Sequence, residues 1–134
     1  MNKQMNNYRV IIAGCRDFDD YALLKERCND YLCEKMETHN VIIVSGHASG
    51  ADALGERFAE EHGLQCEIHP ADWGKYGRSA GPIRNAEMAE VSDALIAFWD
   101  GQNPGTRSMI ELARKKDLQV SVVYFTDKKK RKHH

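Results

Sequence analysis

Five runs of apolar residues divide the chain, and a segment with helical spacing separates each run from the next. The runs cover residues 8–13, 41–45, 65–69, 94–99 and 120–124. Uninterrupted apolar runs of this length are typical of strands that are buried on both faces of a parallel sheet. The third run is the least apolar, which favours a place at the edge of the sheet.

The segments between the runs repeat apolar residues every three or four positions, as amphipathic helices do. In the first segment Leu24 shares a face with Tyr31 or Leu32, and Asp19 or Asp20 is placed to cap the helix. The four helices are expected at about 20–38, 51–62, 82–92 and 105–116. Residues 70–81 form an unusually long connection, which predicts a functional or mobile loop before the third helix.

Alternating strands and helices predict an α/β fold. We expect a single-domain, Rossmann-like three-layer sandwich with about five parallel strands in the order 3-2-1-4-5 and helices on both faces. The chain has 134 residues, enough for one domain with a sizeable core and too few for two. We divide it into an N-terminal extension (1–7), the folded domain (8–125) and a basic tail (126–134) that is expected to be disordered.

Composition narrows the class of protein. No apolar run is long enough to span a membrane and the N-terminus lacks a signal-peptide core, so we expect a cytoplasmic protein with no membrane partner. The four cysteines form no Cys-x-x-Cys pair, and we interpret them as reduced, mostly buried thiols. Cys15 lies beside Arg16, where a thiolate would be stabilised, although a structural role is favoured. We predict no metal site and no cofactor.

Charge is unevenly spread along the chain. The net charge is −1, and residues 128–132 carry five positive charges, so the remainder is net acidic by six charges. An acidic body argues against non-specific nucleic-acid binding by the whole surface. The tail is interpreted as a solvated segment, with weak nucleic-acid contact as the alternative.

Two glycine-rich turns each join a strand to a helix. They are Ser45-Gly46-His47-Ala48-Ser49-Gly50-Ala51-Asp52 and Asp100-Gly101-Gln102-Asn103-Pro104-Gly105-Thr106. Such a junction leaves backbone N–H groups free to hold an anion. Ligands of doubly wound sheets bind at the carboxyl ends of the strands where the winding reverses, here between the first and fourth strands. We therefore expect the two turns to line one cleft.

Four arginines fall at the same edge of the predicted sheet: Arg16, Arg78, Arg84 and Arg107. Guanidinium groups beside a glycine-rich backbone suit a phosphate or carboxylate. The alternative is that each arginine pairs with a nearby acid such as Asp17, Asp72 or Asp100. For the four together we favour an anion site.

Other side chains at this edge carry alternative interpretations. Phe18, Trp73 and Tyr76 are candidates for stacking on a base, although Trp73 is equally suited to filling the core. His47 is a candidate polar contact to the ligand, and Thr106 either caps its helix or touches a phosphate.

Two acids are considered as candidate catalytic residues. Asp52 either caps its helix, orients a ribose hydroxyl or pairs with an arginine. Glu87 is either a general base or, as we favour, the partner of Arg84 three residues earlier. No Ser/His/Asp or Cys/His set can be assembled from sequence neighbours.

Five motifs in order resemble the YspA-type (YpsA-related) branch of the SLOG superfamily. They are Gly14-Cys15-Arg16-Asp17-Phe18, Val44 through Asp52, Pro70-Ala71-Asp72-Trp73, Ala80-Gly81-Pro82-Ile83-Arg84-Asn85-Ala86-Glu87-Met88, and Phe98 through Thr106. The resemblance covers about residues 8–124. The superfamily includes LOG-type phosphoribohydrolases and the DNA-processing protein DprA, with Rossmann-like folds that bind nucleotides, nucleotide-derived ligands or single-stranded DNA.

The resemblance implies a nucleotide-phosphate pocket lined by Gly46, Gly50, Arg84, Gly101, Gly105 and Thr106. The likeness to DprA extends to the Gly14-Cys15-Arg16 turn and to Arg84-Asn85. The phosphoribohydrolases place a catalytic glutamate three residues after the Gly-Thr pair, where this chain has Met109. Relatives commonly form homodimers, so a homodimer is expected from the resemblance alone.

Three functions are therefore compared. The leading hypothesis is a domain that binds a nucleotide or a nucleotide-derived small molecule as a sensor or accessory component. The second is an enzyme acting at the ribose of a nucleotide, with the side chain of Asp52 or Glu87 as its catalytic carboxylate. The third is single-stranded DNA binding through Trp73, Tyr76 and the basic tail.

Overall fold

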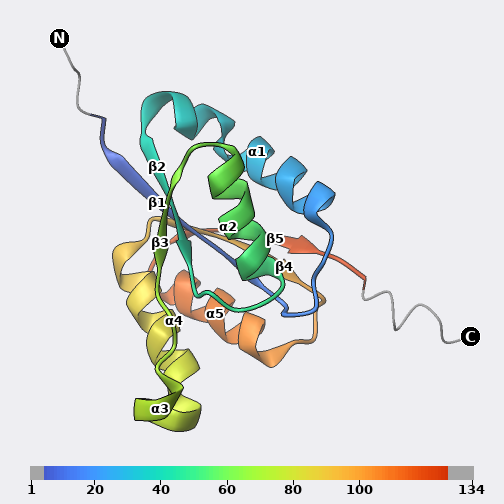
Figure 1. Cartoon of the computed structure of the whole chain (residues 1–134), viewed down its shortest axis with the longest axis vertical. Helices are drawn as coiled ribbons and strands as arrows, with labels where there is room; N and C mark the ends of the chain where they lie inside the picture. The colour runs from blue at the N-terminus through green and yellow to red at the C-terminus, as the bar shows by residue number, and fades with distance from the viewer. Residues whose placement is uncertain (1–4, 127–134) are drawn as a thin grey trace, which may run out of the picture.

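The computed structural model describes residues 5–126 and has a five-stranded parallel sheet in the order β3-β2-β1-β4-β5 (Figure 1). The strands are β1 (Asn7–Gly14), β2 (Asn40–Ser45), β3 (Gln65–Ile68), β4 (Ala94–Trp99) and β5 (Gln119–Tyr124). The predicted strand order is confirmed, and the least apolar strand, β3, lies at an edge. Residues 1–4 of the predicted extension and residues 127–134 of the predicted tail lie outside the described residues.

Helices cover both faces of the sheet (Figure 1). They are α1 (Tyr21–Thr38), α2 (Ala51–Glu61), α3 (Trp73–Tyr76), the 3₁₀ turn η1 (Gly77–Ser79), α4 (Ala80–Val91) and α5 (Pro104–Lys115). Helices α1 and α2 pack on one face, and α4 and α5 pack on the other. No helix within residues 5–126 is both long enough and apolar enough to cross a membrane.

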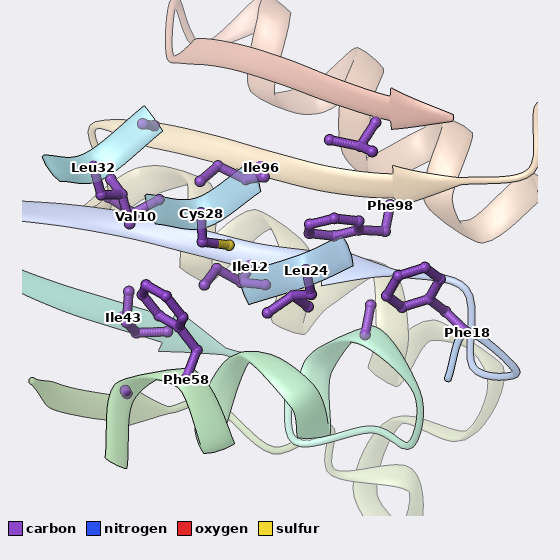
Figure 2. Packing of buried hydrophobic residues seen from close by; sticks show 14 of the residues in the cluster. Val10, Ile12, Phe18, Leu24, Cys28, Leu32, Ile43, Phe58, Ile96 and Phe98 are labelled. Carbon is purple, nitrogen blue, oxygen red and sulfur yellow. The ribbon is translucent and has the colours of Figure 1, made fainter. Parts of the chain in front are cut away.

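The two faces of the sheet have separate hydrophobic clusters because side chains alternate along each strand. Val10 and Ile12 of β1 pack toward Phe58 on α2, whereas Ile11 packs toward Met88 on α4. Figure 2 shows Phe58 and Ile43 on the α2 side of the first cluster. The ring of Phe58 is fully buried, which contributes about 2–3 kcal/mol of hydrophobic stabilisation. Burial on both faces explains the continuous apolar runs.

The predicted start of the first helix is confirmed, with Asp20 as its cap. The Asp20 carboxylate accepts a hydrogen bond from the backbone N–H of Leu23 at 3.1 Å. Leu24 and Leu32 point into the core, and Tyr31 is exposed. Leu32, rather than Tyr31, is therefore the core residue of the predicted pair.

The connection between β3 and α4 differs from the predicted loop because most of it is helical. Asp72 caps the short helix α3 by accepting from the backbone N–H of Lys75 at 3.0 Å. The α4 helix begins at Ala80 rather than Pro82, with Ala80 and Gly81 buried. A four-residue helix is too short to show a hydrophobic period, so sequence spacing gave no sign of it.

Candidate functional site

A cleft of about 680 Å³ lies at the carboxyl ends of β1 and β4, between α4 and α5. Gly14 closes β1 there, and Asp100 directly follows β4. This is the edge at which the winding of the sheet reverses, where the strand order predicted a ligand site. Residues far apart in sequence are thus brought into one concave surface.

The inner wall of the cleft is apolar. Met88 on α4 and Met109 on α5 are almost fully buried beneath it, and Leu112 continues the wall. Trp73 also borders the cleft, with 51% of its surface exposed, so its ring does not fill the core. An exposed indole at the mouth of a cleft offers a flat apolar surface to a ligand.

Arg84 is the best-anchored cation of the cleft. Its Nη1 donates to the backbone carbonyl of Gly46 at 2.6 Å, and its Nε donates to the side-chain oxygen of Asn85 at 2.8 Å. Burial lowers the pKa of the guanidinium, Asp52 opposes this shift and Arg16 adds to it. Arginine nevertheless remains protonated at neutral pH, so Arg16 and Arg84 present two positive charges to one cleft.

Asp52 is buried beside Arg84 and stabilises the first glycine turn instead of capping its helix. Its Oδ2 accepts from the backbone N–H of Ala48 at 3.2 Å, and the N-cap of α2 is Gly50. Burial raises the pKa of the Asp52 carboxyl, while the Ala48 N–H and Arg84 lower it. One of the N–H groups expected to hold an anion is therefore already satisfied by this carboxylate.

The first turn needs glycine at two positions for different reasons. Gly50 has φ of +75°, and a Cβ there would lie 2.3 Å from the carbonyl oxygen of Cys15. A Cβ on Gly46 would instead lie 2.6 Å from Nη1 of Arg84 and 2.9 Å from Oδ2 of Asp52. Gly50 thus lets the turn pass close to the end of β1, and Gly46 leaves room for the side chains of Arg84 and Asp52.

The second turn is held by two side chains that accept from its own backbone. Asp100 Oδ1 accepts from the N–H groups of Gln102 and Asn103, both at 2.8 Å. Asn103 caps α5 by accepting from the N–H of Thr106 at 2.9 Å. Thr106 is therefore not the cap, and its buried hydroxyl lies 3.9 Å from the Cys15 sulfur.

The two turns differ in their glycines as well as in their caps. Gly105 borders the cleft with Asn103 and Thr106, whereas Gly101 turns the chain with φ of +83°. Gly105 and Thr106 thus border the same cleft as Arg84. Gly50 and Gly101 shape their turns and do not border the cleft.

A second, smaller chamber of about 230 Å³ adjoins the cleft. Arg16, Ala48, Trp73 and Arg84 border both spaces, and His47 borders only the smaller one. The site therefore has an apolar-walled compartment and a polar compartment, with both arginines and the indole between them.

Ser45, His47 and Glu56 come together beside the small chamber, which the sequence did not indicate. The Ser45 hydroxyl donates to Glu56 Oε2 at 2.7 Å, and Nδ1 of His47 lies 2.9 Å from the same oxygen. The hydroxyl thus bonds to the carboxylate and not to the imidazole, so this is not a Ser–His–acid nucleophile set. Glu56 lies one helical turn after Asp52, which is its only sequence signal.

Several predicted site residues lie away from the cleft. Phe18 is buried in the core, with its ring 5.0 Å from that of Phe98 (Figure 2), so it cannot stack on a ligand base. Glu87 is exposed outside the cleft, and Arg84 bonds to Gly46 and Asn85 instead. The favoured pairing of Glu87 with Arg84 is therefore wrong.

The prediction of four converging arginines is corrected to two. Arg107 lies over the Trp99 ring, with its guanidinium carbon 5.4 Å from the ring centroid, and Arg78 lies on η1. Neither borders the chambers, and among residues 5–126 no ion pair within 4.0 Å involves Arg16, Arg78, Arg84 or Arg107. Tyr76 is exposed on α3 but likewise borders neither chamber.

The cysteines also depart from one expectation. Cys15 and Cys28 are buried, whereas Cys33 is exposed and Cys66 is partly buried. Burial raises the pKa of the Cys15 thiol, so the structure supports its structural role and not a stabilised thiolate. Within residues 5–126, no group of three or more His, Cys, Asp or Glu side chains is arranged to hold a metal ion.

Comparisons with known proteins agree on the fold. The chain is 33% identical over 126 residues to Gene 61 protein of Mycobacterium phage D29, covering 90% of this chain and 98% of that one. DNA processing protein A (DprA) from Streptococcus pneumoniae superposes with a TM-score of 0.65 at 16% identity, over 90% of this chain and 51% of that one. This chain therefore spans about half the length of DprA. The Moco carrier protein of Chlamydomonas reinhardtii superposes with a TM-score of 0.52 at 17% identity, over 89% and 76% of the two chains.

The sequence model of one family matches the first half of the chain. Its matched region, residues 8–76, runs from β1 through α3 and includes the first glycine turn with Arg16, Asp52 and Trp73. The match covers more than half of the chain. The chain belongs to the YspA, cpYpsA-related SLOG family.

Proposed function

We propose that this protein binds a nucleotide or a nucleotide-derived small molecule, as a sensor or accessory component. One observation carries the proposal: the guanidinium groups of Arg16 and Arg84 share a cleft with an apolar wall and the exposed ring of Trp73. A phosphate requires cations, and a base requires a flat apolar surface. The cleft, at about 680 Å³, falls in the usual range of about 300–1,000 Å³ for small-molecule sites.

The comparisons support a ligand or DNA site in general terms. The solved structures with this fold include a DNA processing protein and a Moco carrier protein. Nucleotide binding is more specific than that evidence, and rests on the chemistry of the cleft.

Isothermal titration calorimetry with AMP, ADP-ribose, NAD and cyclic AMP tests the proposal. We expect at least one to bind, and Arg84→Gln to weaken it by about tenfold or more through loss of a charge-assisted contact. Arg107→Gln is the matched control, because it removes the same charge outside both chambers. Absence of binding for all four compounds at millimolar concentration would contradict the proposal.

A second candidate, single-stranded nucleic acid, is favoured by one observation. Trp73 and Tyr76 are both exposed on the same short helix, 51% and 40% respectively. Bases stack on such rings with little dependence on sequence. Fluorescence anisotropy with oligo-dT tests this candidate, and binding unchanged by Trp73→Ala and by removal of residues 128–134 would count against it.

An enzyme acting at the ribose would depend on Asp52, because Glu87 lies outside the cleft. A hydrolysis assay on the compounds that bind, with the wild type and Asp52→Asn, tests this role. Hydrolytic activity that survives the substitution would exclude Asp52 as the catalytic carboxylate. Cytoplasmic location and homodimer formation remain predictions from the sequence and the resemblance.

A further inference from the structure

His47 is fixed beside the small chamber by contacts on both its backbone and its ring. Its backbone N–H donates to the Ser45 hydroxyl at 3.1 Å, and its Nδ1 lies 2.9 Å from Glu56 Oε2. A carboxylate at Nδ1 selects the tautomer with a proton on that nitrogen. Within residues 5–126 no hydrogen bond is made by the other ring nitrogen, Nε2, so protonation there creates a new donor.

The backbone of His47 is unusual for a residue with a side chain. Its φ is +62°, in the left-handed region that few residues other than glycine adopt. The hydrogen bonds that His47 donates to Ser45 and Glu56 help to hold this conformation. Residues held in such a conformation are often found at functional sites.

The charges around the small chamber are balanced while His47 is neutral. Arg16 and Arg84 supply two positive charges, and the carboxylates of Asp52 and Glu56 offset them. Protonation of His47 therefore changes the net charge of this group from zero to positive.

Two further titratable groups lie nearby, at the end of β3. The backbone N–H of His69 donates to the Ser45 carbonyl. Glu67 accepts from Arg9 at 2.7 Å and lies 3.9 Å from the His69 ring. The charge of Glu67 is therefore offset by Arg9, its own ion-pair partner.

We propose that the small chamber is a phosphate subsite and that His47 is its third cation, so that protonation of His47 strengthens ligand binding. This inference rests on the proposed function, because it assigns the phosphate group of the ligand to one compartment of the same site. The Glu56 carboxylate raises the pKa of His47 above its ordinary value, and Asp52 acts in the same direction. The sign follows directly: binding is stronger below the His47 pKa and weakens as pH rises through it.

Calorimetry with AMP between pH 5.5 and 8.5 tests the inference by comparing the wild type with His47→Asn. Asparagine tolerates the left-handed backbone but does not titrate, and the titration of AMP itself is common to both proteins. We expect nearly equal affinities at pH 8.5 and roughly tenfold tighter binding by the wild type at pH 5.5. A ratio that does not change with pH would overturn the role of His47.

A positioning variant and a direct titration separate this role from a merely structural one. Glu56→Gln is expected to move the midpoint of the pH dependence to lower pH, because the carboxylate that raises the His47 pKa is gone. By NMR, inorganic phosphate should raise the pKa of the His47 ring in the wild type. If AMP binds but the affinity ratio is flat, only the His47 inference fails. If none of AMP, ADP-ribose, NAD and cyclic AMP binds and phosphate leaves the ring titration unchanged, both proposals fail.

Discussion

Gly46→Ala separates the integrity of the site from the stability of the fold. Gly46 does not have a positive φ, so the backbone accepts alanine. The added Cβ would meet only the ends of flexible side chains, at 2.6 Å from Arg84 Nη1 and 2.9 Å from Asp52 Oδ2. The guanidinium must therefore move, and its 2.6 Å hydrogen bond to the Gly46 carbonyl is disturbed.

The magnitude follows from these contacts. Loss of a partly exposed charge-assisted hydrogen bond costs about 1–2 kcal/mol, and the reduced freedom of the unfolded chain returns about 0.4–1 kcal/mol. The net change in unfolding free energy should thus be about 1 kcal/mol or less. Misplacement of Arg84 should raise the Kd for a bound nucleotide about tenfold, which corresponds to about 1.4 kcal/mol.

Two glycines provide matched controls for thermal denaturation and calorimetry. Gly50→Ala forces a Cβ to 2.3 Å from a backbone oxygen at φ of +75°. It should lower stability by about 2–4 kcal/mol and Tm by about 10 °C. Gly74→Ala meets nothing closer than 3.7 Å and should change neither quantity appreciably. The reasoning is refuted if Gly46→Ala lowers Tm as much as Gly50→Ala does, or if it leaves nucleotide affinity unchanged.

Three further predictions concern burial and charge. Asp52→Asn should raise Tm at pH 7, because burial raises the pKa of the Asp52 carboxyl and its ionisation in the fold is unfavourable; the gain should vanish as pH falls below the unfolded-state pKa of about 3.9, and a lower Tm at pH 7 would contradict it. Phe58→Ala should cost about 3–5 kcal/mol in chemical denaturation because the ring is fully buried, whereas Tyr31→Ala, on an exposed ring, should cost less than about 1 kcal/mol. Trp73→Ala should leave Tm within about 2 °C and weaken nucleotide binding about tenfold, and unchanged affinity would exclude the ring from the site.

Most of the fold could be predicted because its central strands are buried on both faces. Val41, Ile42, Ile43 and Val44 are all buried, so their hydrophobicity reports a central strand directly. The short helix within the connection after β3 was not predicted, because its residues are not buried. Helix α3 has no buried residue and is capped by Asp72, which accepts a local hydrogen bond from the backbone N–H of Lys75, so the sequence there has no hydrophobic period.

The edge of the sheet that carries the site could be predicted, but the directions of its side chains could not. Arg16 and Arg107 both follow strand ends, yet Arg16 borders the cleft and Arg107 lies over Trp99. Helical spacing placed Glu87 near Arg84, but Arg84 bonds to Gly46, 38 residues away. Asn103 carried a usable signal, because an asparagine directly before a proline is typical of a helix start.

The position of β1 has a consequence for how the chain is made. β1 is the first strand to be synthesised, but it pairs with β2 on one side and with β4 on the other. Until residues 94–99 leave the ribosome, one edge of a strand containing Val10, Ile11 and Ile12 lacks its partner. An open apolar edge is a template for pairing with other chains. A nascent chain stopped before β4 is therefore expected to aggregate more readily than the complete chain.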